Sequence, residues 1–201
     1  MPSEAGIRPA VAANARAVER LPRLVDELKA WGCEWLGHGL CANTMMHARM
    51  SLAEQRAHIT QSLDTIEKCT GHRPAGWMSQ DWGSTPETYA LLAEAGIRYT
   101  LDWTNDDQPY RMTLPLVALP LSAEWDDVQC QWLRNFTPRA YADLALQAFD
   151  RLRAEGGAVF GLALHPWVSG MSSRIGPLRE LLLALRSREG VHWASPGEIA
   201  K

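Results

Sequence analysis

The sequence predicts an α/β fold in which parallel strands are covered by helices and close into a barrel. Short segments that are apolar throughout alternate with amphipathic helical segments along the 201 residues, as expected of parallel strands that are buried on both faces. The alternative, an open doubly wound sheet, usually carries a glycine-rich phosphate loop after its first strand. Residues 11–18 (VAANARAV) contain no glycine. The sequence therefore favours a barrel, in one domain that spans residues 1–201.

The first predicted unit is a strand, a helix and a second strand. Residues 8–14 form a short apolar run that ends in a polar turn, which is typical of a buried strand. Residues 17–32 carry apolar side chains on one side at helical spacing and end at Gly32, so they predict a helix. Residues 33–39 then predict the second strand.

The next helix has a recognisable start and stop. Ser51 and Glu54 have the spacing of a capping box, and Gly71 follows the last periodic residue. We therefore expect a helix over residues 51–71, followed by a strand over residues 73–79.

A Thr-Pro pair opens the following helix. Thr85 is a candidate N-cap, Pro86 suits the first helical position, and Gly96 suits the stop. These residues predict a helix within 84–96, and residues 97–103 predict the next strand.

The last third of the chain continues the alternation. Residues 114–121 are expected to be extended, although prolines weaken a strand there. Residues 137–157 open on a second Thr-Pro pair and predict a helix, as do residues 175–190. Residues 158–165 predict a strand that ends in a histidine, and residues 191–201 a final strand and tail.

The composition excludes several classes of protein. Apolar residues make up 46% of the chain, the formal net charge is −3, and there is no basic run, so no nucleic acid or membrane partner is expected. Residues 1–18 lack the apolar core of a secretory signal. The four cysteines contain no CxxC pair, which predicts reduced thiols and a cytoplasmic location.

Four side chains with possible chemistry follow predicted strands. His38, Trp77, Asp102 and His165 all lie at the C-terminal ends of these segments. In a βα barrel these ends meet at one mouth, where the active site is built. We therefore expect the four side chains to share one pocket.

His165 is the strongest candidate for acid–base chemistry. A neutral imidazole can give or take a proton near neutral pH, and Pro166 would stiffen the chain where the strand ends. Gly170 and Arg174 would form a shaped, cationic substrate edge. A hydrogen-bonded structural histidine is the alternative.

His38 lies between two glycines, which let a ligand approach closely. It is a candidate metal ligand, but Ala42 and Asn43 occupy the positions of a second histidine in the usual spacing, so a conventional zinc site is poorly supported. A histidine that lines a cleft is the alternative.

Arg73, Trp77 and Asp102 could complete a site. Arg73 could align a carboxylate and Trp77 could form an aromatic wall, or the two could be a surface and a core residue. A carboxylate at position 102 could hold a histidine in one tautomer. Asp106 and Asp107 fit a solvated turn equally well.

Taken in chain order, four segments resemble the polysaccharide deacetylase (NodB-homology) superfamily, in particular its allantoinase-like branch. They are residues 33–39 (CEWLGHG), 73–77 (RPAGW), 99–110 (YTLDWTNDDQPY) and 162–176 (LALHPWVSGMSSRIG). The resemblance covers nearly all of the chain.

The resemblance implies an irregular (β/α)7-type barrel and hydrolysis of a C–N bond in an amide. It implies that His165 is the general acid, that Asp102 orients it, that Arg73 aligns the catalytic base and that His38 is the first histidine of a metal motif. The cofactor is then either none or a single divalent metal such as Zn. Candidate substrate-binding residues are Trp77, Asp107, Trp103, Arg174 and Asn43.

Two departures from the family pattern leave alternatives open. The second metal histidine is absent. The motif that supplies the catalytic base would lie upstream of residues 6–14 (GIRPAVAAN), so we expect an N-terminally incomplete barrel without its first strand. A catalytically inactive carbohydrate- or ureide-binding domain, with Trp77, Trp103 and Trp167 stacking on the ligand, is one alternative. A zinc deacetylase that uses His38 and His47 is another.

The expected partners follow from these hypotheses. The substrate would be a small-molecule or sugar amide. A barrel without one strand exposes backbone hydrogen-bonding groups, so we also expect a homo-oligomer.

Overall fold

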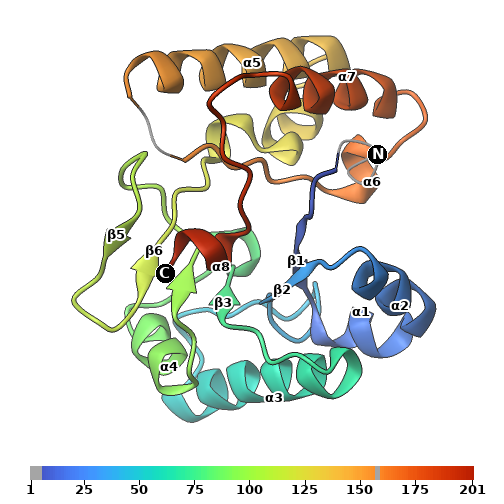
Figure 1. Cartoon of the computed structure of the whole chain (residues 1–201). Coiled ribbons are helices and arrows are strands. Elements are labelled where there is room, and N and C mark those ends of the chain that lie inside the picture. The colour runs from blue at the N-terminus through green and yellow to red at the C-terminus, as the bar shows by residue number, and fades with distance from the viewer. Residues whose placement is uncertain (1–5, 157–158) are drawn as a thin grey trace. The chain divides into compact units, whose positions relative to one another are not determined.

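The computed structural model describes residues 6–156 and 159–201 (Figure 1). Strands from the first part of the chain form a six-stranded, mostly parallel sheet. The strands are β1 (Ala10–Ala13), β2 (Glu34–Gly37), β3 (Gly76–Trp77), β4 (Tyr99–Thr100), β6 (Val117–Ala118) and β5 (Tyr110–Arg111), in that spatial order. Neighbours from β1 to β6 pair in parallel, and β5 pairs with β6 antiparallel. The predicted α/β class with parallel strands is confirmed, and closure into a barrel stays a prediction.

The described residues form two compact units, each of which is described by itself. The sheet unit comprises Arg8–Trp103, Pro109–Leu119 and Ala194–Lys201. The helical unit comprises the described residues up to Ile7, together with Thr104–Gln108 and Pro120–Trp193. A single domain over the whole chain stays a prediction.

The first predicted helix is divided by a proline. The chain forms α1 (Ala15–Arg20) and α2 (Pro22–Ala30), and Leu21 between them has φ −121° and ψ 57°. Proline has no backbone N–H and disfavours the helical conformation at the residue before it. Pro22 therefore ends one helix and starts the next.

Helix α3 (Leu52–Thr70) covers the sheet and has the predicted ends. Glu54 and Ser51 form the reciprocal capping box, and Gly71 adopts a left-handed conformation with φ 79°. Ile59, Leu63 and Ile66 are at most 1% exposed. Burial of this apolar stripe, rather than helix propensity, is the main stabilisation of such a helix.

Helix α4 (Thr88–Glu94) is shorter than predicted, because it begins three residues after Thr85. The Thr85 backbone N–H donates to the Thr88 hydroxyl at 2.9 Å, which makes a turn before the helix rather than a cap on it. The C-terminal tail ends in α8 (Pro196–Ile199), where Gly197 N–H donates to Glu34 at 2.9 Å. No strand is assigned within residues 191–195, contrary to the expectation.

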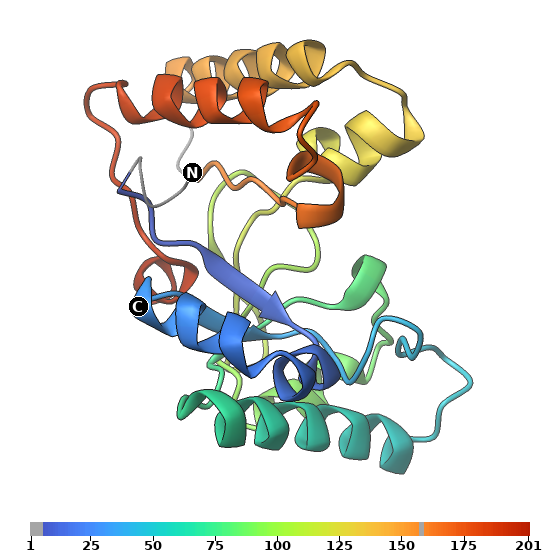
Figure 2. The same cartoon turned by 90° about the vertical axis from the view of Figure 1, so that its right-hand side faces the viewer.

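The helical unit is built on two long helices, α5 (Pro138–Ala154) and α7 (Ile175–Arg186). They lie side by side in both views (Figures 1 and 2). Their common core includes Tyr141 of α5, Leu181 of α7 and Cys130. Thr137 caps α5 and Pro138 takes its first position, as predicted.

The segment before His165 differs from the prediction. Gly157 and Ala158, the expected end of the helix and start of the strand, lie outside the described residues. Residues 159–165 belong to no described strand. Their polar groups bond to loops and side chains instead: Trp125 donates its indole N–H to Gly161 O at 2.8 Å, and Asp127 N–H donates to Ala163 O at 3.4 Å. Single contacts with loop backbone and with the Trp125 side chain therefore replace the regular ladder of a sheet.

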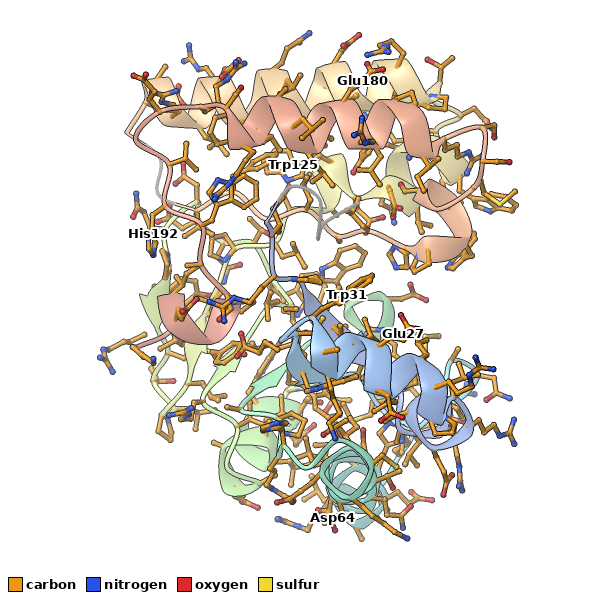
Figure 3. The ribbon with its side chains drawn as sticks, turned by 45° about the vertical axis from the view of Figure 1, so that its right-hand side comes forward. Glu27, Trp31, Asp64, Trp125, Glu180 and His192 are labelled. Atoms are coloured by element: carbon orange, nitrogen blue, oxygen red, sulfur yellow. The ribbon has the colours of Figure 1, made fainter. Side chains whose placement is uncertain are left out.

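Trp125 shows how this segment is held in the helical unit. It lies beneath the helices in Figure 3 and stacks on Phe160, with ring centroids 5.2 Å apart. None of the described helices is long and apolar enough to cross a membrane.

Candidate active site

The first group of candidate residues lies at one edge of the sheet unit. The strand register aligns Gly37, Trp77 and Thr100, the last residues of three neighbouring parallel strands. His38 follows the first of these residues directly, and Asp102 comes two residues after the last. The parallel register therefore brings the segments that carry them to the same sheet edge, where α/β proteins bind ligands.

Asp102 is deeply buried at this edge and is held by Ser79. Its Oδ1 accepts from the Ser79 backbone N–H at 2.6 Å, and its Oδ2 accepts from the Ser79 hydroxyl at 2.9 Å. Only 1% of the residue is exposed. Burial raises the pKa of the Asp102 carboxyl because it disfavours the charged form, and the hydrogen bonds from Ser79 oppose that rise.

His38 is fixed by two hydrogen bonds, one at its ring and one at its own carbonyl group. Its Nδ1 lies 2.6 Å from the Met78 carbonyl oxygen, and its own carbonyl accepts from Asn14 Nδ2 at 2.5 Å. A carbonyl oxygen can only accept, so Nδ1 carries the hydrogen. In the neutral ring, Nε2 is then the basic nitrogen.

Arg73 contacts α3 rather than this edge. Its guanidinium lies 2.7 Å from Asp64 and 2.8 Å from Glu67, two exposed carboxylates; Asp64 is labelled on the outer side of α3 in Figure 3. Arg73 precedes β3, whereas Ser79 follows it. The described contacts are thus surface ion pairs, and alignment of a catalytic base by Arg73 stays a prediction.

The candidate substrate-binding side chains of the sheet unit differ in how far they are exposed to solvent. Trp77 is 1% exposed and donates its indole N–H to Ser79 Oγ at 3.0 Å, so it presents no face to a ligand, which an aromatic wall requires. Trp103 is 52% exposed and donates to Ser84 Oγ at 3.1 Å. Asn43 is also exposed and accepts from the Cys41 thiol at 3.0 Å.

The second group lies in the helical unit and centres on His165. This residue precedes α6 (Pro166–Ser169). Its backbone N–H donates to Asp127 Oδ2 at 2.8 Å, and its Nδ1 lies 2.7 Å from Asp127 Oδ1. The carboxylate is fully buried, whereas the imidazole is 37% exposed. The arrangement is a half-exposed imidazole held at one nitrogen by a buried carboxylate.

A second carboxylate stands beside this pair. Asp126 Oδ2 lies 4.0 Å from His165 Nδ1, and Asp126 Oδ1 accepts from the Gln129 N–H at 2.9 Å. Burial raises the pKa of Asp126, and the Gln129 N–H and the histidine oppose this. The sequence reasoning did not single out Asp126 or Asp127; an acidic pair shortly after the apolar run 114–121 was the available signal.

An exposed indole lies beside the imidazole, and a second exposed indole packs against the first. Trp167 is 54% exposed and Trp132 is 57% exposed, and their ring centroids are 5.5 Å apart in an edge-to-face arrangement. The Trp167 ring centroid lies 6.0 Å from that of His165. Two of the other predicted contacts also belong to this unit: Arg174 at the start of α7 and Asp107, both half-buried.

The described residues do not fit a zinc site at His38. Structural and catalytic zinc sites use three or four protein ligands. Among residues 6–156 and 159–201, the three-membered group of potential ligands is Asp126, Asp127 and His165, which includes neither His38 nor His47. His47 is exposed, and its Nδ1 accepts from the Arg49 N–H at 3.2 Å. Within the group of Asp126, Asp127 and His165, the 2.7 Å contact between His165 Nδ1 and Asp127 Oδ1 is a hydrogen bond.

Known proteins of the same fold support the resemblance. No protein-family model matches the chain. A peptidoglycan deacetylase of Helicobacter pylori is 22% identical over 203 residues, which cover 82% of this chain and 69% of the relative. A structure described as a polysaccharide deacetylase of Mycobacterium smegmatis matches with a TM-score of 0.87 and 25% identity, over 99% of this chain and 72% of the other.

An allantoinase shares the fold as well. The structure of Puue allantoinase matches with a TM-score of 0.86 and 26% identity, over 96% of this chain and 66% of that chain. This chain thus spans about two thirds of the length of these proteins. The chain is therefore similar to polysaccharide deacetylases and to an allantoinase that share one fold.

Proposed function

We propose that this protein is a hydrolase of non-peptide amide C–N bonds, of the deacetylase or allantoinase kind, with His165 as its general acid. The observation that carries the proposal is the contact between the half-exposed imidazole and the buried carboxylate of Asp127. A carboxylate at Nδ1 fixes the ring and favours its protonated form, which a proton donor requires. The related deacetylases and allantoinase supply the reaction class.

In the proposed reaction, the oxygen of a water molecule bonds to the amide carbonyl carbon, and the C–N bond then breaks. His165 donates its Nε2 proton to the departing nitrogen. The attacking water loses one proton to solvent, from which His165 regains its own, so that the products are a carboxylic acid and an amine. The carbonyl oxygen gains negative charge during attack, and a donor must stabilise it. Donors near His38, at the sheet edge, are proposed for this role, since the neutral His38 ring already gives its one N–H to Met78 O. Asp102 and Arg73 are proposed as supporting residues.

The substrate is proposed to be a small-molecule or sugar amide. The proposed contacts are exposed or half-buried side chains: Trp103, Asn43, Asp107 and Arg174. Trp77 offers no exposed surface for this purpose.

The test is hydrolysis of three substrate classes, an N-acetylated sugar, an acetylated glycan and an allantoin-like ureide, by wild type and His165→Ala. Loss of the proton donor is expected to lower kcat/KM about 10²- to 10⁴-fold on the class that is hydrolysed. His192→Ala is the matched control, since it removes an exposed histidine of the same unit, labelled in Figure 3. Wild-type turnover by a folded His165→Ala protein contradicts the proposal.

A binding module of the same fold is the second candidate, and the exposed indoles of Trp103 and Trp167 favour it. It predicts that wild type binds one of these ligands in calorimetry and hydrolyses none of them. Detectable turnover by wild type, lost in His165→Ala, rejects this candidate.

Location and assembly are also proposals. Four free cysteines accord with a reducing, cytoplasmic compartment, which cell fractionation tests. Strand β1 lies at one end of the strand order, and an unpaired edge favours self-association. Light scattering that shows only monomers at high concentration contradicts a homo-oligomer.

A further inference from the structure

We infer that Asp127, rather than Asp102, is the positioning residue that holds His165 in its donor orientation. This inference rests on the proposed function of His165. It also departs from the family resemblance, which assigns the orienting role to Asp102.

Asp127 holds the histidine at two points. One carboxylate oxygen accepts from the backbone N–H of His165 at 2.8 Å, and the other lies 2.7 Å from Nδ1. The backbone N–H of Asp127 in turn donates to Ala163 O at 3.4 Å. Main chain and side chain of the histidine are therefore tied to the same buried group, which limits rotation of the ring.

Asp102 has a different set of partners. Both of its oxygens accept from Ser79, at 2.6 and 2.9 Å. Its hydrogen bonds thus join the ends of β4 and β3 within the sheet unit. A carboxylate used in this way stabilises the loop after β3, and nothing in its described contacts orients an imidazole.

The distances favour Asp127 as the carboxyl group that acts on the ring, since its Oδ1 lies 2.7 Å from Nδ1 and the nearest Asp126 oxygen lies 4.0 Å away. Asp126 is the other carboxyl near Nδ1, and burial raises its pKa and so favours its neutral form. Burial also raises the pKa values of Tyr141 and Cys130, which keeps both uncharged at neutral pH. The titratable groups that act on this cluster are Asp126, Tyr141, Cys130, Arg134 and Glu124.

The variant Asp127→Asn separates positioning from simple packing, because it keeps the size of the side chain. Two donors of His165 face the carboxylate, but an amide has one oxygen and one NH₂ group. If the amide oxygen accepts from the backbone N–H, the NH₂ group faces Nδ1 and opposes a proton there. The variant is therefore expected to disfavour the imidazolium and to move the neutral ring to the Nε2–H tautomer.

The first readout is NMR titration of the His165 imidazole, which needs no substrate. In Asp127→Asn, the titration midpoint of His165 is expected to fall by about one pH unit or more. Asp143→Asn, an exposed change on α5, is the control for the loss of one negative charge and is expected to leave the midpoint in place. An unchanged midpoint in folded Asp127→Asn overturns the inference.

The ¹⁵N shifts of wild type give a second readout if the variant does not fold. Above its titration midpoint, His165 is expected as the Nδ1–H tautomer, and a Nε2–H tautomer overturns the inference. The third readout is the pH dependence of hydrolysis, measured on an amide that wild type hydrolyses. The alkaline limb of the kcat/KM profile is expected to move to lower pH in Asp127→Asn and to keep its position in Asp102→Asn. If wild type hydrolyses none, the proposed function fails, while the titration still decides whether Asp127 holds the ring.

Discussion

Asp102 accepts two hydrogen bonds from Ser79, one from its backbone N–H at 2.6 Å and one from its hydroxyl at 2.9 Å. These bonds link the loops that follow β3 and β4. They stabilise the charged carboxylate, but burial has the larger effect and raises its pKa. Ionisation of Asp102 is therefore less favourable in the folded protein than in the unfolded chain.

This shift predicts a pH dependence of stability. Because the folded protein binds the proton more tightly, the contribution of Asp102 is fully present at acidic pH and is lost as the pH rises through the raised pKa. Relative to Asp102→Asn, which does not titrate, the free energy of unfolding of wild type is expected to fall as the pH rises from about 4, the ordinary pKa of an aspartate, through the raised pKa of Asp102. Urea unfolding of both proteins measures this difference. A difference that rises with pH would show that the hydrogen bonds from Ser79 outweigh burial.

Close packing at the sheet glycines gives a second prediction. A Cβ added at Gly37 would collide with the ring of Trp77 and come within 3.1 Å of Leu63, and both side chains are almost fully buried. Gly37→Ala is therefore expected to lower the free energy of unfolding by about 1–3 kcal/mol, the usual cost of overpacking.

The control for this substitution is Gly176→Ala in α7, where no atom lies within 4 Å of the added Cβ. That change is expected to be neutral or to stabilise by about 0.4–1 kcal/mol, since it reduces the freedom of the unfolded chain. Thermal and urea unfolding compare the two variants. Equal stability of Gly37→Ala and wild type would mean that the indole moves aside without cost.

Local signals predicted most of the elements. The capping box at Ser51, the stop at Gly71 and the Thr-Pro start of α5 depend on residues a few positions apart, and the structure has each of them. Pro22 was present in the sequence, and its effect on Leu21 would have divided the first helix correctly. The apolar run before His165 resembled a strand because a short run of apolar residues does not show which bonds the backbone makes; of residues 159–165, only Ala163 is buried and the others are half-buried.

Long-range pairing explains what the sequence did not predict at the candidate site. His165 and Asp127 are 38 positions apart, and no spacing rule joins them. The same holds for Ser79 and Asp102, which are 23 positions apart. That His38, Arg73, Asp102 and His165 share one pocket stays a prediction, since it concerns residues of both units.

The exposed indoles beside His165 lead to a prediction about substrate binding. Trp167 lies edge-on to the imidazole, at 6.0 Å between centroids, and more than half of its surface is exposed. If the substrate ring stacks on it, Trp167→Ala is expected to raise KM about three- to tenfold, the equivalent of about 0.5–1.5 kcal/mol for an aromatic contact, with little change in kcat. Trp31→Ala, at an exposed indole after α2 in the sheet unit (Figure 3), is expected to leave KM unchanged. Steady-state kinetics on the hydrolysed amide measure both constants. A fall in kcat at unchanged KM would instead show that Trp167 supports the orientation of His165, because loss of an interaction made only in the transition state lowers kcat alone.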